Sequence, residues 1–190
     1  MSRRARIVLA GVPHHVTQRG NHRQQVFFDD AGRLAYLDWL RLYAAEEAVS
    51  VLAYCLMPNH IHLVAVPAKP DSLHRSLKSL HGRYAHRVNR ERAWAGHLWQ
   101  GRFHSTPMDE SHLWAAVRYV ELNPVRAGLV ALAQHYRWSS AAAHCGLRHD
   151  PVLSADARWQ PQVEAVGDWS AWLAAAAGDT QETVPSDQCR

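Results

Sequence analysis

Residues 49–66 read VSVLAYCLMPNHIHLVAV, and this stretch decides the fold. Two apolar runs, 49–57 and 60–66, flank Pro58-Asn59, and a turn pair between two β-prone runs predicts a β-hairpin. Side chains alternate between the two faces of a strand, so His60 and His62 leave one face and Ile61 leaves the other. The hairpin therefore presents two imidazoles side by side on one face of a sheet.

The segments on either side of the hairpin alternate between strand and helix patterns, and Asp or Ser residues stand where the helices would be capped. The expected order is a strand at Val12–Arg19 that stops at Gly20-Asn21, a helix from Asp29 or Asp30 to about Glu47, the hairpin, a helix from about Leu73 to Arg92, a strand at Leu98–Pro107, and a helix from Asp109 to Asn123-Pro124. The last helix is expected to end there because a residue before proline is pushed out of the helical region.

This order, β-α-β-β-α-β followed by a helix, is typical of the ferredoxin-like or RRM-like split β-α-β plan of the α+β class. It predicts a four-stranded antiparallel sheet with helices on one face, which leaves the other face open for a site. We expect residues 1–149 to form one domain. Residues 150–190 are expected to be a loosely attached acidic extension with one short helix, Trp169–Ala177.

The composition bounds the class of protein. Hydrophobic residues make up 47% of the 190 residues and charged residues 20%, which permits a packed core and excludes wholesale disorder. No apolar run approaches the ~18 residues of a membrane helix, and the run at 7–12 is too short for a secretory signal. The three cysteines are odd in number and far apart, which fits a reducing compartment. We therefore expect a cytoplasmic protein with no membrane partner.

The charge is unevenly distributed. Residues 1–148 hold 19 Lys and Arg against 10 Asp and Glu, a net charge of +9, whereas residues 149–190 hold 2 against 7, a net charge of −5. Only Lys69 and Lys78 are lysines, and arginine binds phosphate with a planar fork of donors. A genomic base composition that favours arginine codons would give the same skew. The basic body suggests a polyanionic partner, and the acidic tail either is solvated or competes for the same surface.

Two elements carry candidate chemistry. His60 and His62 are a natural pair of metal ligands, although among 14 histidines an isolated His-x-His is a weak signal. In the last predicted helix Tyr119 and Asn123 are four residues apart and share a face beside a buried apolar stripe. Taken alone, the tyrosine would be a half-buried residue that packs against the core, and the asparagine would end the helix. Together, a hydroxyl nucleophile, a metal pair with an amide ligand and many arginines are what phosphodiester cleavage needs.

Four segments, in this order, resemble those of the HUH single-tyrosine transposases, and most closely the REP-associated tyrosine transposases. The resemblance covers residues 6–146. The matching stretches are Val16–Asn21 (VTQRGN), Met57–Val64 (MPNHIHLV), Leu98–Phe103 (LWQGRF) and Tyr119–Val130 (YVELNPVRAGLV), with Tyr136–Ser140 (YRWSS) as a C-terminal signature.

The resemblance implies a single-strand DNA endonuclease and strand transferase that depends on Mg²⁺ or Mn²⁺ and cuts near REP-type hairpins. It would leave a 5′-phosphotyrosine and a free 3′-OH. His60 and His62 match the metal ligands and Tyr119 matches the nucleophile, on a C-terminal catalytic helix. Asn123 stands where insertion-sequence relatives carry a glutamine that completes the metal site. The enzyme would act as a monomer, or as a homodimer that exchanges its tyrosine helix.

Arginines of three segments are candidates for gripping DNA phosphates, although some of them could simply be solvated. These candidates are Arg3, Arg4, Arg6, Arg19, Arg23, Arg83, Arg87 and Arg90. Two other functions stay open. A non-catalytic, RRM-like module would bind single strands on its sheet, but it would present aromatic residues where this strand presents histidines. A zinc hydrolase would need a third His, Cys or carboxylate ligand and an acidic base, and no local motif supplies them.

Overall fold

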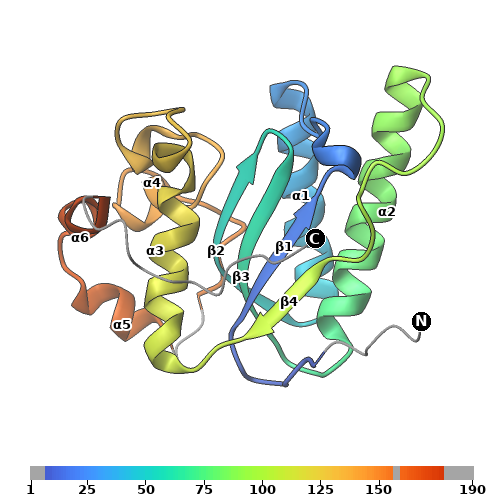
Figure 1. Ribbon diagram of the computed structural model, residues 1–190. Coiled ribbons are helices and arrows are strands. Elements are labelled where there is room, and N and C mark those ends of the chain that lie inside the picture. The colour runs from blue at the N-terminus through green and yellow to red at the C-terminus, as the bar shows by residue number, and fades with distance from the viewer. Residues whose placement is uncertain (1–6, 156–158, 178–190) are drawn as a thin grey trace.

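The chain alternates strand and helix in the expected order, as the computed structural model in Figure 1 shows for residues 7–155 and 159–177, the part of the chain that it describes. The elements are β1 (His14–Arg19), η1 (Asn21–Arg23), α1 (Asp30–Glu46), β2 (Val49–Met57), β3 (His60–Pro67), α2 (Ser72–Arg92), β4 (His104–Pro107), α3 (Glu110–Arg126), η2 (Ala133–His135), α4 (Ala141–His144), α5 (Gln160–Ala165) and α6 (Trp169–Ala177). Among the described residues no helix is both long and apolar enough to cross a membrane.

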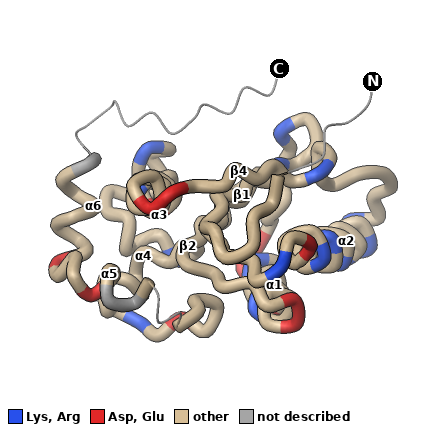
Figure 2. Tube along the Cα trace, turned by 90° about the horizontal axis from the view of Figure 1, so that it is seen from below, with Lys and Arg blue, Asp and Glu red and all other residues tan. Residues whose placement is uncertain are grey.

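The four strands form one antiparallel sheet in the order β2-β3-β1-β4. This is the split β-α-β arrangement, so the predicted α+β fold class is confirmed. Helices α1 and α2 cover one face of the sheet, and α3 lies on the other (Figures 1 and 2). The open face expected from the sequence is therefore the face that α3 crosses.

The main core lies between the sheet and the helices α1 and α2. Phe27, Tyr36 and Tyr84 are buried, and their ring centroids lie 5.2 Å from one another. Their largely edge-on packing is the arrangement that aromatic quadrupoles favour. The Tyr84 hydroxyl donates to the carbonyl of Val26 at 2.9 Å, which satisfies the one polar atom that this ring buries.

The fourth strand is shorter than predicted, because it begins at His104 and not at Leu98. Residues 98–103 are irregular since their large side chains turn into the core. Leu98 and Trp99 are buried, and the Trp99 indole donates to the carbonyl of His81 at 3.0 Å. An isolated bridge between Gly20 and Trp99 extends the pairing on this side. Burial of the aromatic ring thus takes precedence over regular strand pairing.

Helix α3 continues past Asn123-Pro124 to Arg126, so the predicted end is wrong by three residues. Proline lacks an N–H, so Pro124 removes one backbone hydrogen bond from the helix. Because Pro124 lies in the last turn of α3, the other contacts of that turn can still maintain the helix. Gly128, at φ 68°, ends the helix by donating to Val125, while Leu129 donates to Pro124, both at 2.9 Å. This pair of bonds is a Schellman motif, which sets the end at Gly128.

Residues 150–155 and 159–177 pack firmly on the body, so for this part of the tail the loose attachment expected from its composition is wrong. Helix α6 has the predicted bounds, and its Trp169 and Leu173 are each only 2% exposed. Ser154 exchanges hydrogen bonds with Val51 at the edge strand β2. The reason is apolar: rings of Trp114 on α3 and Trp172 on α6 pack around Trp169. The domain boundary after residue 149 stays a prediction.

Candidate functional site

The face of the sheet beneath α3 carries a row of polar side chains from neighbouring strands. In the register of β1 and β3, Arg19 lies opposite His60 and Thr17 opposite His62. Cα partners in an antiparallel pair point to the same face, and alternation along β1 adds His15 to this set. Two strands thus bring three histidines and an arginine together.

Helix α3 holds Tyr119 directly over these histidines. The Tyr119 ring centroid lies 5.5 Å from that of His62 and 5.9 Å from that of His15, edge-on in both cases. The helix is fixed there because Leu113, Val117 and Val120 are buried. Asp109 caps the first turn by accepting the backbone N–H of His112 at 2.9 Å. The tyrosine and the histidine pair, 57 residues apart in the sequence, therefore share one patch.

Both histidines of the pair are held through Nδ1. His60 Nδ1 lies 2.6 Å from Asn59 Oδ1, and His62 Nδ1 lies 3.0 Å from His15 Nε2. The two ring centroids of the pair are 4.9 Å apart, and the His15 ring stacks on His62 at 5.3 Å with an angle of 8° between the planes. Nε2 is then the nitrogen through which each ring of the pair could bind a metal.

The electrostatics of this face keep His62 neutral. Burial lowers the pKa of His62 well below its usual 6.5, and the charges of His15, His60 and Arg19 lower it further. Only the neutral imidazole offers a lone pair to a metal. A neutral His62 beside His60, both with oriented rings, therefore fits a divalent cation that keeps positions open for oxygen ligands.

Among the described residues, this face carries no closed metal cage. Within residues 7–155 and 159–177, no group of three or more His, Cys, Asp or Glu side chains is arranged to hold a metal ion. This part of the chain thus lacks the third ligand that a zinc hydrolase would require. Asn123 lies one turn after Tyr119 on α3, is half-buried, and makes no side-chain hydrogen bond or ion pair in the described structure. Its part as a ligand stays a prediction.

The predicted DNA-contacting arginines fall into three groups. Arg19 lies on the histidine face, and Arg23 follows in η1, where its carbonyl accepts from Asn59 Nδ2 at 3.1 Å. Arg83, Arg87 and Arg90 lie on α2, in the layer on the opposite side of the sheet (Figure 2). Arg3, Arg4 and Arg6 lie outside the described residues.

Two arginines of α2 already have protein partners. Arg83 stacks over Trp39, with its guanidinium carbon 4.5 Å from the ring centroid, and donates to the Tyr43 hydroxyl at 3.1 Å. Arg87 forms an ion pair with Glu91 at 2.9 Å. These contacts explain the conformations of the two side chains without DNA.

Sequence reasoning missed two residues of the site. His15 is not among the predicted site residues, although the strand period places it on the same face as Arg19. Arg126, whose guanidinium carbon lies 5.3 Å from the Tyr119 ring centroid, stands seven residues after the tyrosine. Seven residues are nearly two helical turns, so the helix period could have indicated this contact.

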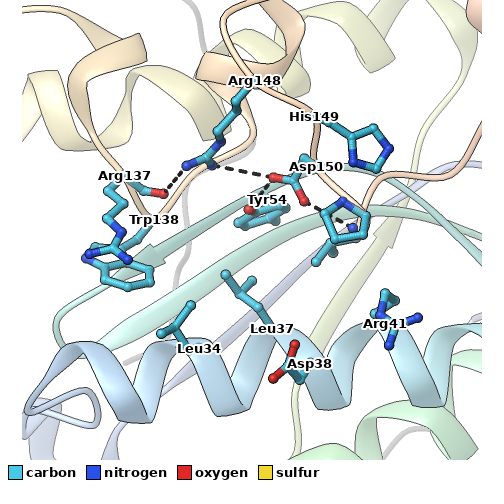
Figure 3. Close-up of a pocket in the computed structure, with 12 residues that line it drawn as sticks. Leu34, Leu37, Asp38, Arg41, Tyr54, Arg137, Trp138, Arg148, His149 and Asp150 are labelled. Carbon is cyan, nitrogen blue, oxygen red and sulfur yellow. Dashed lines mark hydrogen bonds and ion pairs between the residues drawn. The ribbon is translucent and has the colours of Figure 1, made fainter.

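A hollow of about 240 Å³ on the other side of the sheet is separate from this site (Figure 3). It lies between α1 and residues 148–152 and is lined by Tyr54, whose side chain leaves the opposite face of the sheet from His62. The Tyr54 hydroxyl donates to Asp150 at 2.6 Å, and Arg148 donates to the Ser139 carbonyl at 2.7 Å. Its buried polar groups thus satisfy one another.

The fold and the site define a ferredoxin-like α+β protein with a histidine pair beneath a tyrosine-bearing helix. The family model described as "Transposase IS200 like" matches residues 10–123, which contain His60, His62, Tyr119 and Asn123. The chain therefore belongs to the IS200-like transposases, in agreement with its resemblance to the single-tyrosine HUH transposases.

Two solved structures are similar to this chain. A REP-associated tyrosine transposase bound to a REP hairpin matches with a TM-score of 0.65 and 19% identity, over 82% of this chain and 93% of that one. A candidate transposase from Deinococcus radiodurans R1 matches with a TM-score of 0.43 and 23% identity, over 63% of this chain and 96% of that one. A comparison with curated proteins gives no match. The first structure supports the fold.

Proposed function

We propose that this transposase-family protein cleaves and rejoins single-stranded DNA at REP-type hairpins through a 5′-phosphotyrosine on Tyr119. Mg²⁺ or Mn²⁺ would be held by His60 and His62, with Asn123 as a third ligand. The observation that carries the proposal is the position of the Tyr119 ring, 5.5 Å from His62, on the face where one phosphate could meet both groups.

The chemistry of the chain's own groups is a transesterification. The Tyr119 oxygen attacks the scissile phosphorus and loses its proton, and the bond from phosphorus to the 3′ oxygen breaks and leaves a 3′-OH. When bound, the cation would polarise the phosphate and neutralise the developing charge. Because the phosphotyrosine keeps the energy of the phosphodiester, a 3′-OH can attack it and restore the strand without a nucleotide cofactor.

The arginines near the site are suited to hold the DNA backbone. Arg19 lies opposite His60 in the sheet, and Arg126 lies over the Tyr119 ring. One guanidinium group can donate to two phosphate oxygens at once. Arg3, Arg4, Arg6, Arg23, Arg83, Arg87 and Arg90 remain proposed contacts with the rest of a hairpin. A hairpin substrate is favoured by the similarity to a transposase that was solved with a REP hairpin.

A single chain supplies both the histidine pair and the tyrosine, since the ring contacts join residues of one molecule. We infer that the protein can act as a monomer, and that a homodimer with exchanged helices is not needed to complete the site. The cytoplasmic localisation expected from the sequence is part of this proposal.

The test is a cleavage assay with an end-labelled single-stranded hairpin oligonucleotide and Mn²⁺. The wild type should cut the strand, whereas Tyr119→Phe and His60→Ala should lose cutting and keep DNA affinity within a few-fold, because arginines supply most of that affinity. Tyr43→Phe is the matched control, since Tyr43 contacts Arg83 of α2 on the other side of the sheet. Cutting by Tyr119→Phe would refute the proposal, and binding without cutting by the wild type would favour the non-catalytic module.

A further inference from the structure

The two histidines of the pair are each held at Nδ1 by a neighbour that the metal-binding motif does not include. We propose that Asn59 and His15 are positioning residues that hold His60 and His62 through Nδ1 and leave Nε2 as the ligating nitrogen. This inference rests on the proposed function, because it assumes that the pair binds a divalent cation.

The direction of the Asn59 hydrogen bonds is set by a backbone carbonyl. Asn59 Nδ2 lies 3.1 Å from the carbonyl oxygen of Arg23, which can only accept, so the amide nitrogen must face it. Asn59 Oδ1 then faces His60 Nδ1 at 2.6 Å, and an oxygen of this kind can only accept. His60 therefore carries its proton on Nδ1, and in the neutral ring Nε2 has the lone pair.

The turn after β1 holds the Arg23 carbonyl in place. Gly20 donates to the Asn59 carbonyl at 2.8 Å, and a Cβ on Gly20 would lie 2.2 Å from the Gln24 carbonyl oxygen. Arg23 itself has a φ of 59°, which ordinary side chains adopt rarely. The turn at residues 20–24 and the turn at 58–59 thus form one unit that presents the Asn59 amide to His60.

His15 plays the corresponding part for His62. Its Nε2 lies 3.0 Å from His62 Nδ1 and its ring is parallel to that of His62, so both rotation and tilt of the His62 ring are restricted. If His62 binds a cation through Nε2, its Nδ1 carries the proton and His15 Nε2 accepts it. The His15 ring centroid also lies 5.9 Å from that of Tyr119, so His15 contacts both the proposed ligand His62 and the proposed nucleophile.

The first test is direct binding of Mn²⁺ to the full chain without DNA, by calorimetry or by the electron paramagnetic resonance signal of free Mn²⁺. Loss of a partner of this kind weakens metal affinity by about 10–100-fold, which is the effect expected for Asn59→Ala and His15→Ala. Asn59→Asp keeps an acceptor for Nδ1 and should restore binding. His86→Ala and Asn89→Ala are matched controls and should bind like the wild type. His86 is exposed on α2, on the other side of the sheet, and Asn89 of the same helix donates to Gly96.

The second test needs no variant of the positioning residues. In protein labelled with ¹⁵N-histidine, nitrogen shifts should report Nδ1–H on His60 without metal, with the signal assigned from His60→Ala. The opposite tautomer at His60, or Mn²⁺ affinity within twofold of the wild type in folded Asn59→Ala and His15→Ala, would overturn the positioning roles alone. Failure of the wild type to bind Mn²⁺ would overturn the metal part of the proposed function as well.

Discussion

Replacing Glu121 by glutamine should lower the free energy of unfolding by about 2–3 kcal/mol, because this carboxylate anchors α3 to the C-terminal segment. The Glu121 side chain is fully buried. Its Oε1 accepts from Ser140 Oγ at 2.5 Å and His144 Nδ1 at 2.6 Å, and its Oε2 accepts from Trp169 Nε1 at 2.8 Å. Glutamine offers only one oxygen, so its NH₂ must face at least one of these donors.

The size of the effect follows from counting those bonds. A hydrogen bond to a charged group contributes about 1.5–3 kcal/mol, and a buried donor left without a partner costs about 1–3 kcal/mol. If the glutamine oxygen takes the place of Oε1, its NH₂ group faces the Trp169 indole N–H. That N–H then loses its hydrogen bond and has no acceptor. Residues two apart on a helix point to nearly opposite sides, so the change should not touch Tyr119 directly.

The assay is urea unfolding of the wild type, Glu121→Gln, Trp169→Phe and the double variant. Trp169→Phe removes the donor of the same bond, so the two changes should be non-additive by about 1 kcal/mol or more in a double-mutant cycle. Glu110→Gln, whose exposed carboxylate accepts from Gln162, is the control and should change stability by less than about 0.5 kcal/mol. A loss below about 0.5 kcal/mol in Glu121→Gln would refute the reasoning.

Three further changes test other parts of the structure. Gly20→Ala should destabilise the fold by about 2 kcal/mol or more in thermal unfolding, because its Cβ would lie 2.2 Å from a backbone oxygen. Gly82→Ala, whose Cβ would meet no atom within 4 Å, should instead stabilise α2 by up to about 1 kcal/mol. Equal effects of the two changes would contradict this. Burial lowers the pKa of His81 to about 3, so the unfolded state takes up a proton below pH 6.5 while the native state does not. Stability should therefore fall from pH 6.5 towards pH 3 by up to about 1.4 kcal/mol per unit, and an unchanged slope in His81→Gln would exclude this residue as the cause. Arg19→Ala should weaken hairpin binding by about 5–10-fold in fluorescence anisotropy at fixed salt, and by more than Arg83→Ala, since Arg19 lies on the histidine face and Arg83 lies on the other side of the sheet. The reverse order would place the DNA on the α2 side.

The sequence was sufficient for the hairpin and the histidine pair, because both depend on short-range patterns. The turn pair Pro58-Asn59 and the strand period place His60 and His62 on one face without knowledge of the rest of the chain. The period of α3 likewise places Tyr119 beside the buried stripe. Local rules of this kind hold when tertiary contacts do not oppose them.

The contacts that the sequence did not predict depend on register and burial. His15 meets His62 only because β1 and β3 pair with Arg19 opposite His60, and neither strand encodes that register by itself. Glu121 is fully buried, although acidic side chains are almost never buried unless they are paired, so its partners had to come from the structure. The apolar spacing of Trp169, Trp172 and Leu173 indicates a packed helix, whereas the acidic composition of the tail favours a solvated segment.

The most direct measurement of the central claim is mass spectrometry of the covalent product formed with a hairpin oligonucleotide and Mn²⁺. The other tyrosines lie elsewhere: Tyr36, Tyr54, Tyr84 and Tyr136 are buried, and Tyr43 faces α2. We predict a single nucleotide-bearing peptide, with the 5′-phosphate on Tyr119. Cleavage of the DNA without any adduct, or an adduct on another residue, would contradict the assignment of Tyr119 as the nucleophile above the histidine pair.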